Sequence, residues 1–209
     1  VMLEKHELLA LFKRGLIPGP SETEEAFLMR VSKRLAVERL PEVWGFSIDW
    51  VPLQFSSKKL YFWEGAVFWD TPMIQIHPKL QTKKLFGNSL TEILHHESIH
   101  AARETFDEPF FEEVLAYRTS PYAWKRFLGP IFQRVWEFPL FALACFIFPL
   151  LFPIVVFFVL RLFYKQALLN RLSRKYPLAV LLCLTDKEIR SQRIMWDNSP
   201  RCQLISALL

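Results

Sequence analysis

The sequence predicts an α+β fold in which helices surround a small β-sheet and a hydrophobic membrane-embedded helical segment follows. Capping signals and helical periodicity frame a block of aromatic and β-branched residues in the first half of the chain, and a long apolar run lies in the second half. The 209 residues are 52% apolar, enough for one folded core with an appendage. We expect a core over residues 1–137, a transmembrane or re-entrant segment over residues 138–163 and a basic tail with a short helix over residues 164–209.

Two helices are expected before the β-like block. Residues 3–14 carry apolar side chains at helical spacing, and Gly15 and the breaker Pro18-Gly19-Pro20 follow. The run Ser21-Glu-Thr-Glu24 has the pattern of a capping box, which predicts a second helix to about Val37. Its buried side would carry Phe27, Leu28, Val31 and Leu35. The β-like block comprises residues 44–51, 60–63 and 67–76, from which we expect about three strands.

Two further helices are predicted after the sheet. Ser89-Leu-Thr-Glu92 is another capping-box pattern and predicts a helix from about Leu90 to Arg103. Proline is favoured at the first position of a helix, so Pro109 predicts a second helix that continues to Ser120, before Pro121.

The first of these helices contains the sequence LHHESIH, which has the pattern HExxH. His96 and His100 are four residues apart and therefore lie on one helix face, where both imidazoles can bind one metal ion. Hydrolysis at zinc needs such ligands, an open position for water and a carboxylate to take the water's proton, for which Glu97 is placed. His95 is outside this frame because its fourth following residue is Ile99.

Together with Glu112 and Glu113 on the next helix, the HExxH segment resembles the gluzincin group of zinc metallopeptidases. The resemblance covers residues 60–118 and implies a zincin-like core in which a glutamate of the following helix completes the metal site. Glu113 is the implied ligand, and Glu112 is the alternative. The implied site therefore holds one zinc ion through His96, His100 and Glu113, with Glu97 as the catalytic base.

The resemblance has departures and further implications. The gap from His100 to Glu113 is short for many gluzincins, and Val114 stands where a glycine often follows the ligand. The metzincin pattern would require a histidine where Phe106 stands. The resemblance also implies that residues 67–77 form an edge strand above the cleft, on which a peptide binds as an added strand.

A donor that stabilises the reacting carbonyl is expected opposite the base. Tyr117 is assigned this catalytic role, and Arg118 and Tyr122 are the alternatives. The other histidines, His6, His77 and His95, are interpreted as structural or capping residues. The pair Phe110-Phe111 is expected to pack in the core.

Residues 139–160 contain no charged or strongly polar side chain. A helix over this run would extend about 33 Å, which matches the hydrocarbon core of a membrane. The flanks carry three basic residues before the run (Lys125, Arg126 and Arg134) and five after it (Arg161, Lys165, Arg171, Arg174 and Lys175), which mildly favours a cytoplasmic C-terminal side for a single span.

A single span would place the zinc site outside, although the N-terminus has no signal-peptide pattern. A re-entrant hairpin, broken at Pro149 and Pro153, would keep both flanks and the catalytic core on the cytoplasmic side. A single kinked span is the alternative. Beyond it, Thr185 to Glu188 form a third capping-box pattern, which predicts a helix through about Met195 in a tail that packs back onto the core.

The expected function is that of a membrane-associated zinc metallopeptidase that hydrolyses peptide bonds through zinc-activated water. Its partners would be the lipid bilayer and a protein or peptide substrate, with no nucleic acid, because the net charge of +5 accompanies no nucleic-acid motif. Three cysteines without CxxC spacing indicate neither a disulfide framework nor a thiolate zinc site. The alternative is a non-catalytic membrane-associated interaction protein with a degenerate or structural metal site.

Overall fold

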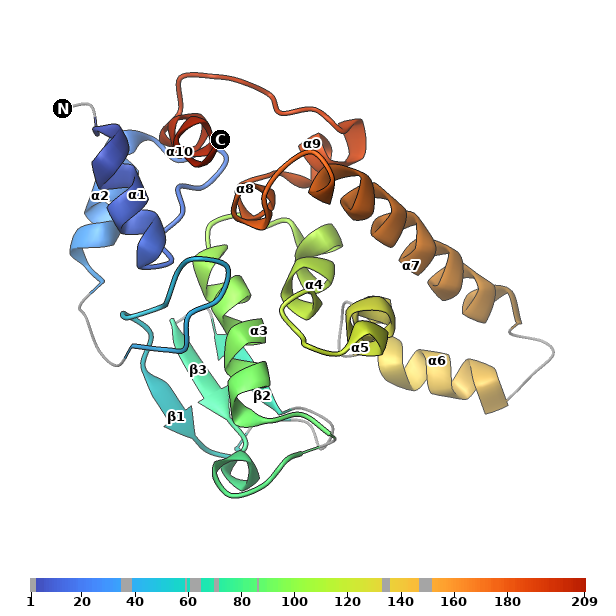
Figure 1. Ribbon diagram of the computed structural model, residues 1–209. Coiled ribbons are helices and arrows are strands. Elements are labelled where there is room, and N and C mark those ends of the chain that lie inside the picture. The colour runs from blue at the N-terminus through green and yellow to red at the C-terminus, as the bar shows by residue number, and fades with distance from the viewer. Residues whose placement is uncertain are drawn as a thin grey trace.

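The computed structural model combines helices with a three-stranded sheet (Figure 1), which confirms the α+β class. The structure describes residues 3–34, 39–58, 60, 65–69, 72–85, 87–132, 136–146 and 152–209. Side chains from residues 8–116 and from residues 168–205 share one hydrophobic cluster, which extends from Leu8 on helix α1 (Lys5–Lys13) to Ile205 on α10 (Pro200–Leu208). The C-terminal segment thus packs on the same core as the N-terminal helices.

Helix α2 (Glu24–Ser32) begins two residues later than the capping-box pattern predicts. Thr23, not Ser21, is the N-cap, and its hydroxyl accepts a hydrogen bond from the amide of Ala26. The acids of the predicted box have other partners, since Glu22 binds Arg30. Phe27 is fully buried, Leu28 and Val31 are half-buried, and Leu35 and Val37 lie outside the described residues.

The sheet has the strand order β1-β3-β2. Strand β1 (Leu53–Phe55) pairs in parallel with β3 (Met73–Ile76), and β2 (Ala66–Trp69) pairs antiparallel with β3, so β2 lies at one edge of the described sheet. The expected sheet of about three strands is confirmed, but the strand predicted over residues 44–51 is wrong. These aromatic residues form a buried loop, because Trp44 and Gly45 adopt positive φ in a tight turn and the Trp50 indole donates to the carbonyl of Arg14. Residues 61–64 lie outside the described part.

The helices that carry the HExxH pattern and Glu113 form where the capping signals predict them. Helix α3 (Leu90–Ala102) starts at Ser89, whose hydroxyl accepts a hydrogen bond from the amide of Glu92. Helix α4 (Pro109–Tyr117) starts at Pro109 but ends three residues before Ser120. Its N-terminus is capped from a distance, because the Asp186 carboxylate accepts hydrogen bonds from the amides of Phe110 and Phe111.

The described residues of the apolar run belong to two helices instead of one. After α5 (Ala123–Leu128) and a short 3-10 helix, η2 (Gly129–Ile131), helix α6 (Glu137–Phe146) and helix α7 (Phe152–Ser173) pack side by side as a hairpin that projects from the body (Figure 1). The rings of Phe141 and Phe158 lie 5.7 Å apart, centre to centre, and Arg161 binds Glu137 at 2.6 Å. Pro153 lies in the first turn of α7, whereas Pro149 lies outside the described residues.

By length and composition α7 could cross a membrane. Several basic residues counted in the flanks of the apolar run face other parts of the protein. Lys125 is buried against Glu92, Arg161 pairs with Glu137, and Lys165 is buried over the ring of Phe110. The comparison of three basic residues before the apolar run with five after it therefore does not indicate how the protein is oriented in a membrane.

The C-terminal segment ends in three short helices. Helix α8 (Leu178–Leu182) is buried, and the predicted capping box of Thr185 and Glu188 starts α9 (Asp186–Ser191). Helix α9 ends at Ser191, four residues earlier than expected, because Gln192 adopts the left-handed conformation. Helix α10 then packs against α1.

Candidate metal centre

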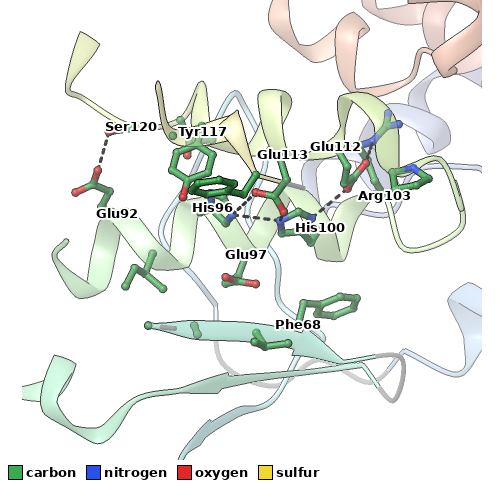
Figure 2. A pocket seen from close by; sticks show the side chains of 18 of the residues that line it. Phe68, Glu92, His96, Glu97, His100, Arg103, Glu112, Glu113, Tyr117 and Ser120 are labelled. Carbon is green, nitrogen blue, oxygen red and sulfur yellow. Dashed lines mark hydrogen bonds and ion pairs between the residues drawn. The ribbon is translucent and has the colours of Figure 1, made fainter. Parts of the chain in front are cut away.

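Helices α3 and α4 pack together and bring three donor side chains to one point (Figure 2). The Nε2 atoms of His96 and His100 lie 3.2 Å apart, and each lies 3.5 Å from a carboxylate oxygen of Glu113. One donor atom from each residue lies within 4.8 Å of the others. The three metal ligands proposed from the sequence therefore converge.

The spacing of these donors fits a small divalent cation. Ligands at about 2.0–2.1 Å from a tetrahedral zinc ion are separated from one another by about 3.3–3.4 Å. The two imidazole nitrogens lie 3.2 Å apart, close to this value, and each lies 3.5 Å from a different oxygen of Glu113, Oε2 for His96 and Oε1 for His100. Two imidazoles and one carboxylate are also the donor types of a catalytic zinc site, in which a fourth position stays open for water or substrate.

Glu112 contacts His100 but does not belong to the donor cluster. The Nδ1 atom of His100 lies 3.3 Å from a carboxylate oxygen of Glu112, and when Nε2 gives up its proton this contact favours the tautomer that keeps the proton on Nδ1. Glu112 also accepts a hydrogen bond of 2.7 Å from Nε of Arg103, while Nη1 of the same guanidinium donates to the carbonyls of Leu182 and Leu184 at 2.6 and 3.1 Å. A chain of contacts thus connects the metal centre to the C-terminal helices.

The electrostatics of the cluster favour a positive charge. Burial opposes protonation of His100, but its hydrogen bond to Glu112 and the negative charges of Glu113, Glu112 and Glu97 outweigh burial and raise its pKa to about 10. Burial lowers the pKa of His96, and the charge of neighbouring His100 lowers it further. Burial raises the pKa of Glu113. A site that holds one proton so strongly also attracts a metal cation, which would compete with this proton.

Glu97 lies on the side of α3 that faces strand β2, between the donor cluster and the sheet edge (Figure 2). It is 6% exposed and lines a cavity of about 770 Å³ together with His96, His100 and Glu113. Val67 and Phe68 of β2 also line this cavity. The carboxylate is therefore close to the metal centre without being among its three donors.

Tyr117 is the one sequence-proposed carbonyl stabiliser that lines this cavity. Its ring packs edge-to-face on the ring of His96 at 4.7 Å, and burial together with the charges of Glu113 and Glu97 raises the pKa of its hydroxyl, so the phenol stays a proton donor. A Cβ at Gly129 would lie 2.2 Å from the Tyr117 ring, so glycine permits this contact.

The two alternatives to Tyr117 point elsewhere. Arg118 binds Asn170 and Ser173 on α7, and Tyr122 is exposed. The remaining histidines lie apart from the donor cluster: His77 caps η1 (Pro78–Gln81), His6 is exposed beside Glu4 and His95 is half-buried.

Sequence reasoning missed two features of the site. Arg103 lies three residues after His100, on the same helix face, and this spacing is the only local signal of its role. Buried Lys125 binds both oxygens of Glu92 at 3.0 Å, and Ser120 donates to Glu92 at 2.6 Å, which ties α5 to the start of α3.

Comparison of the chain with protein-family models, with curated proteins and with solved structures finds no match. What the site can do therefore follows from its own geometry, and the gluzincin resemblance stays a prediction.

Replacing Glu112 with glutamine is expected to weaken zinc binding by about 10–100-fold, because loss of an outer-shell carboxylate loosens the orientation and basicity of the histidine that it holds. Competition with a chromophoric chelator measures this affinity in the purified protein. Glu25→Gln, on the exposed face of α2, is the matched control. Unchanged affinity in the Glu112 variant would contradict the orienting role, and complete loss of zinc would make Glu112 a ligand.

Proposed function

We propose that the protein is a membrane-associated zinc metallopeptidase. The observation that carries this proposal is the convergence of His96, His100 and Glu113 beside a fourth group, Glu97, in one cavity. A purely structural metal site is usually closed by four protein ligands, whereas three ligands in an accessible cavity are typical of a catalytic site. When bound, the zinc ion supplies Lewis acidity that polarises a carbonyl and lowers the pKa of water.

The side chains around the donor cluster would transfer the proton, stabilise the carbonyl oxygen and orient a ligand. Glu97 accepts a proton from the attacking water and passes it to the leaving amine, as a buried carboxylate next to a cation can. Tyr117, held protonated, donates a hydrogen bond to the carbonyl oxygen as negative charge develops on it. Glu112 and Arg103 keep the His100 ring in its binding orientation.

The position of strand β2 is an argument that the substrate is a peptide. It is at the edge of the described sheet, pairs with β3, and contributes Ala66, Val67 and Phe68 to the lining of the cavity. An extended peptide can add to such an edge through backbone hydrogen bonds, and these contacts do not depend on sequence. The prediction of one edge strand over residues 67–77 is therefore correct only for β2, which lies at the edge and lines the cavity. Strand β3 is the central strand of the sheet.

The hairpin α6–α7 supports attachment to a bilayer. Its first helix and residues 152–164 of the second rise about 15 Å and about 20 Å, which is too short for a span of about 30 Å but enough to enter one leaflet. The rest of α7 is buried against the body, with Leu168, Leu169 and Leu172 in the core. We therefore propose a re-entrant hairpin, with the catalytic core and both ends of the hairpin on one side, the cytoplasmic side.

The test is hydrolysis of a degenerate mixture of fluorogenic peptides by detergent-purified protein. We expect cleavage to stop when a chelator removes zinc and to return when stoichiometric zinc is added back. Cleavage that survives removal of the metal would contradict the proposal. Bound zinc without any cleavage would favour a non-catalytic interaction protein with a structural metal site.

A further inference from the structure

We propose that the substrate is a polypeptide anchored in the bilayer and cleaved in the segment next to its membrane anchor. This inference rests on the proposed peptidase function and identifies the class of its substrate. It follows from the way in which the cavity of the metal centre continues into the membrane hairpin.

The cavity and the hairpin share a wall. Phe132, which follows η2, and Phe138, on α6, line the same cavity as His96 and Glu97. The Phe132 ring contacts the rings of Phe138 at 5.6 Å, Phe141 at 5.4 Å and Phe158 at 6.0 Å, centre to centre. The aromatic side chain at the cavity wall is therefore also part of the packing between α6 and α7.

The base of the hairpin is clamped to the catalytic body. Arg161 of α7 joins the two helices of the hairpin by binding both oxygens of Glu137 on α6, at 2.8 and 2.6 Å, and joins α7 to the body by donating to the carbonyl of Ile131 on η2 at 2.9 Å. Gln166 donates to the carbonyls of Arg126 and Phe127 at 2.7 and 3.2 Å. The position of the hairpin relative to the metal centre is thus fixed by buried polar contacts, and the depth of the cavity above a membrane is fixed with it.

Large apolar side chains cover the outside of the hairpin and meet the cavity at Phe138, which is 40% exposed. The others include Leu143 at 51%, Phe157 at 58%, Leu160 at 63% and Phe163 at 54% exposed. A soluble surface rarely leaves so many contiguous apolar side chains in water. The hydropathy of α7 supports lipid as the environment of the exposed side chains on this helix. Exposed Trp124 and Trp136, near the base, are of the type that gathers at the membrane–water boundary.

The far end of the cavity is polar. Glu104, Asp107 and Glu108 line it where α3 passes into α4, one helix length from Tyr117 and η2. An extended segment along β2 would therefore have one end at the apolar base of the hairpin and the other in water. A segment that emerges from the bilayer has this polarity, because its apolar end leads back to its own anchor.

The experiment uses full-length protein reconstituted in phosphatidylcholine–phosphatidylglycerol vesicles and one degenerate fluorogenic segment in three forms. The first form is soluble, the second is fused directly to a single apolar span, and the third is separated from that span by a Gly/Ser spacer of about 30 residues, which extends about 30 Å. We expect the directly fused form to be cleaved at least 10-fold faster than the spaced form. The spaced form controls for simple enrichment on the vesicle, which raises the local concentration of both anchored forms.

Equal rates for the directly fused and spaced forms would overturn this inference and leave the peptidase proposal intact. Absence of cleavage of all three forms by zinc-loaded protein would overturn the peptidase proposal itself, and this inference with it.

A double variant distinguishes the role of the hairpin in membrane binding and substrate preference from the hydrolysis reaction itself. Leu143→Gln with Leu160→Gln changes two exposed side chains outside the cavity, so we expect cleavage of the soluble form to persist, while flotation with vesicles and the preference for the directly fused form fall at least several-fold. Met29→Gln, an exposed apolar residue on α2, is the matched control. A double variant that floats poorly but keeps the full preference would overturn the role of the hairpin in substrate selection.

Discussion

Replacing Glu97 with glutamine is expected to reduce peptide hydrolysis by about 10²–10⁴-fold, the usual contribution of a positioned general base. Glutamine has the same shape and preserves the packing of a side chain that is 6% exposed, but it cannot accept a proton. Because Glu97 lies on the β2 side of α3, outside the three donors, about one zinc per chain should remain bound. Initial rates on the degenerate peptide mixture and elemental analysis of the same sample measure both quantities.

The comparison requires that the variant be folded and loaded with metal. Glu25→Gln, an exposed acid-to-amide change on α2, controls for the effect of removing one negative charge and should retain wild-type rates. If the Glu97 variant turned over at the wild-type rate, its role as base would be wrong. If it lost zinc, Glu97 would belong to the ligand set, and the catalytic base would have to be sought elsewhere in the cavity.

Local sequence signals were sufficient to predict where the two helices that carry the site begin. Serine at 89 and proline at 109 mark the starts of α3 and α4, because a hydroxyl cap and a fixed φ act within one turn of the helix. The i, i+4 spacing of His96 and His100 follows from helix geometry alone. Helix geometry alone does not distinguish Glu112 from Glu113 as the ligand, because neighbouring residues differ by about 100° around the helix axis and either side chain could face α3. The way in which α4 rotates against α3 decides which of them faces the imidazoles.

Long-range contacts explain what the sequence could not predict. Arg103 is held by carbonyls 79 and 81 residues further along the chain, and Asp186 caps α4 from 75 and 76 residues away. Periodicity in residues 139–160 could not distinguish one long apolar helix from two short ones, because a uniformly apolar run has no preferred face. The pairing of Glu137 with Arg161, 24 residues apart, fixes the hairpin. Residues 44–51 have the composition of a strand, but their large apolar side chains are buried in a loop instead.

Replacing His96 with alanine is expected to remove zinc from the purified protein and to abolish peptide hydrolysis. Apparent zinc-binding free energies of about 10–16 kcal/mol, shared among four ligands, assign about 3 kcal/mol to each, so loss of one donor should weaken binding by about 100-fold or more. His95→Ala is the matched control, since it removes the same side chain from the adjacent position on α3 but not from the donor cluster. Elemental analysis after dialysis against a weak chelator should find zinc in the His95 variant and not in the His96 variant.

Thermal unfolding with and without added zinc separates loss of the metal site from loss of the fold. A ligand that binds only the native state stabilises it in proportion to the logarithm of its concentration relative to Kd, so zinc should raise the Tm of wild-type protein and of the His95 variant. The His96 variant should unfold cooperatively but without a zinc-dependent shift, and Glu113→Ala should show a smaller shift than wild type. Equal zinc content and equal shifts in the two histidine variants would show that the HExxH frame is an ordinary polar face of α3. The peptidase proposal would then fail, because it requires a zinc ion to activate the water that Glu97 deprotonates.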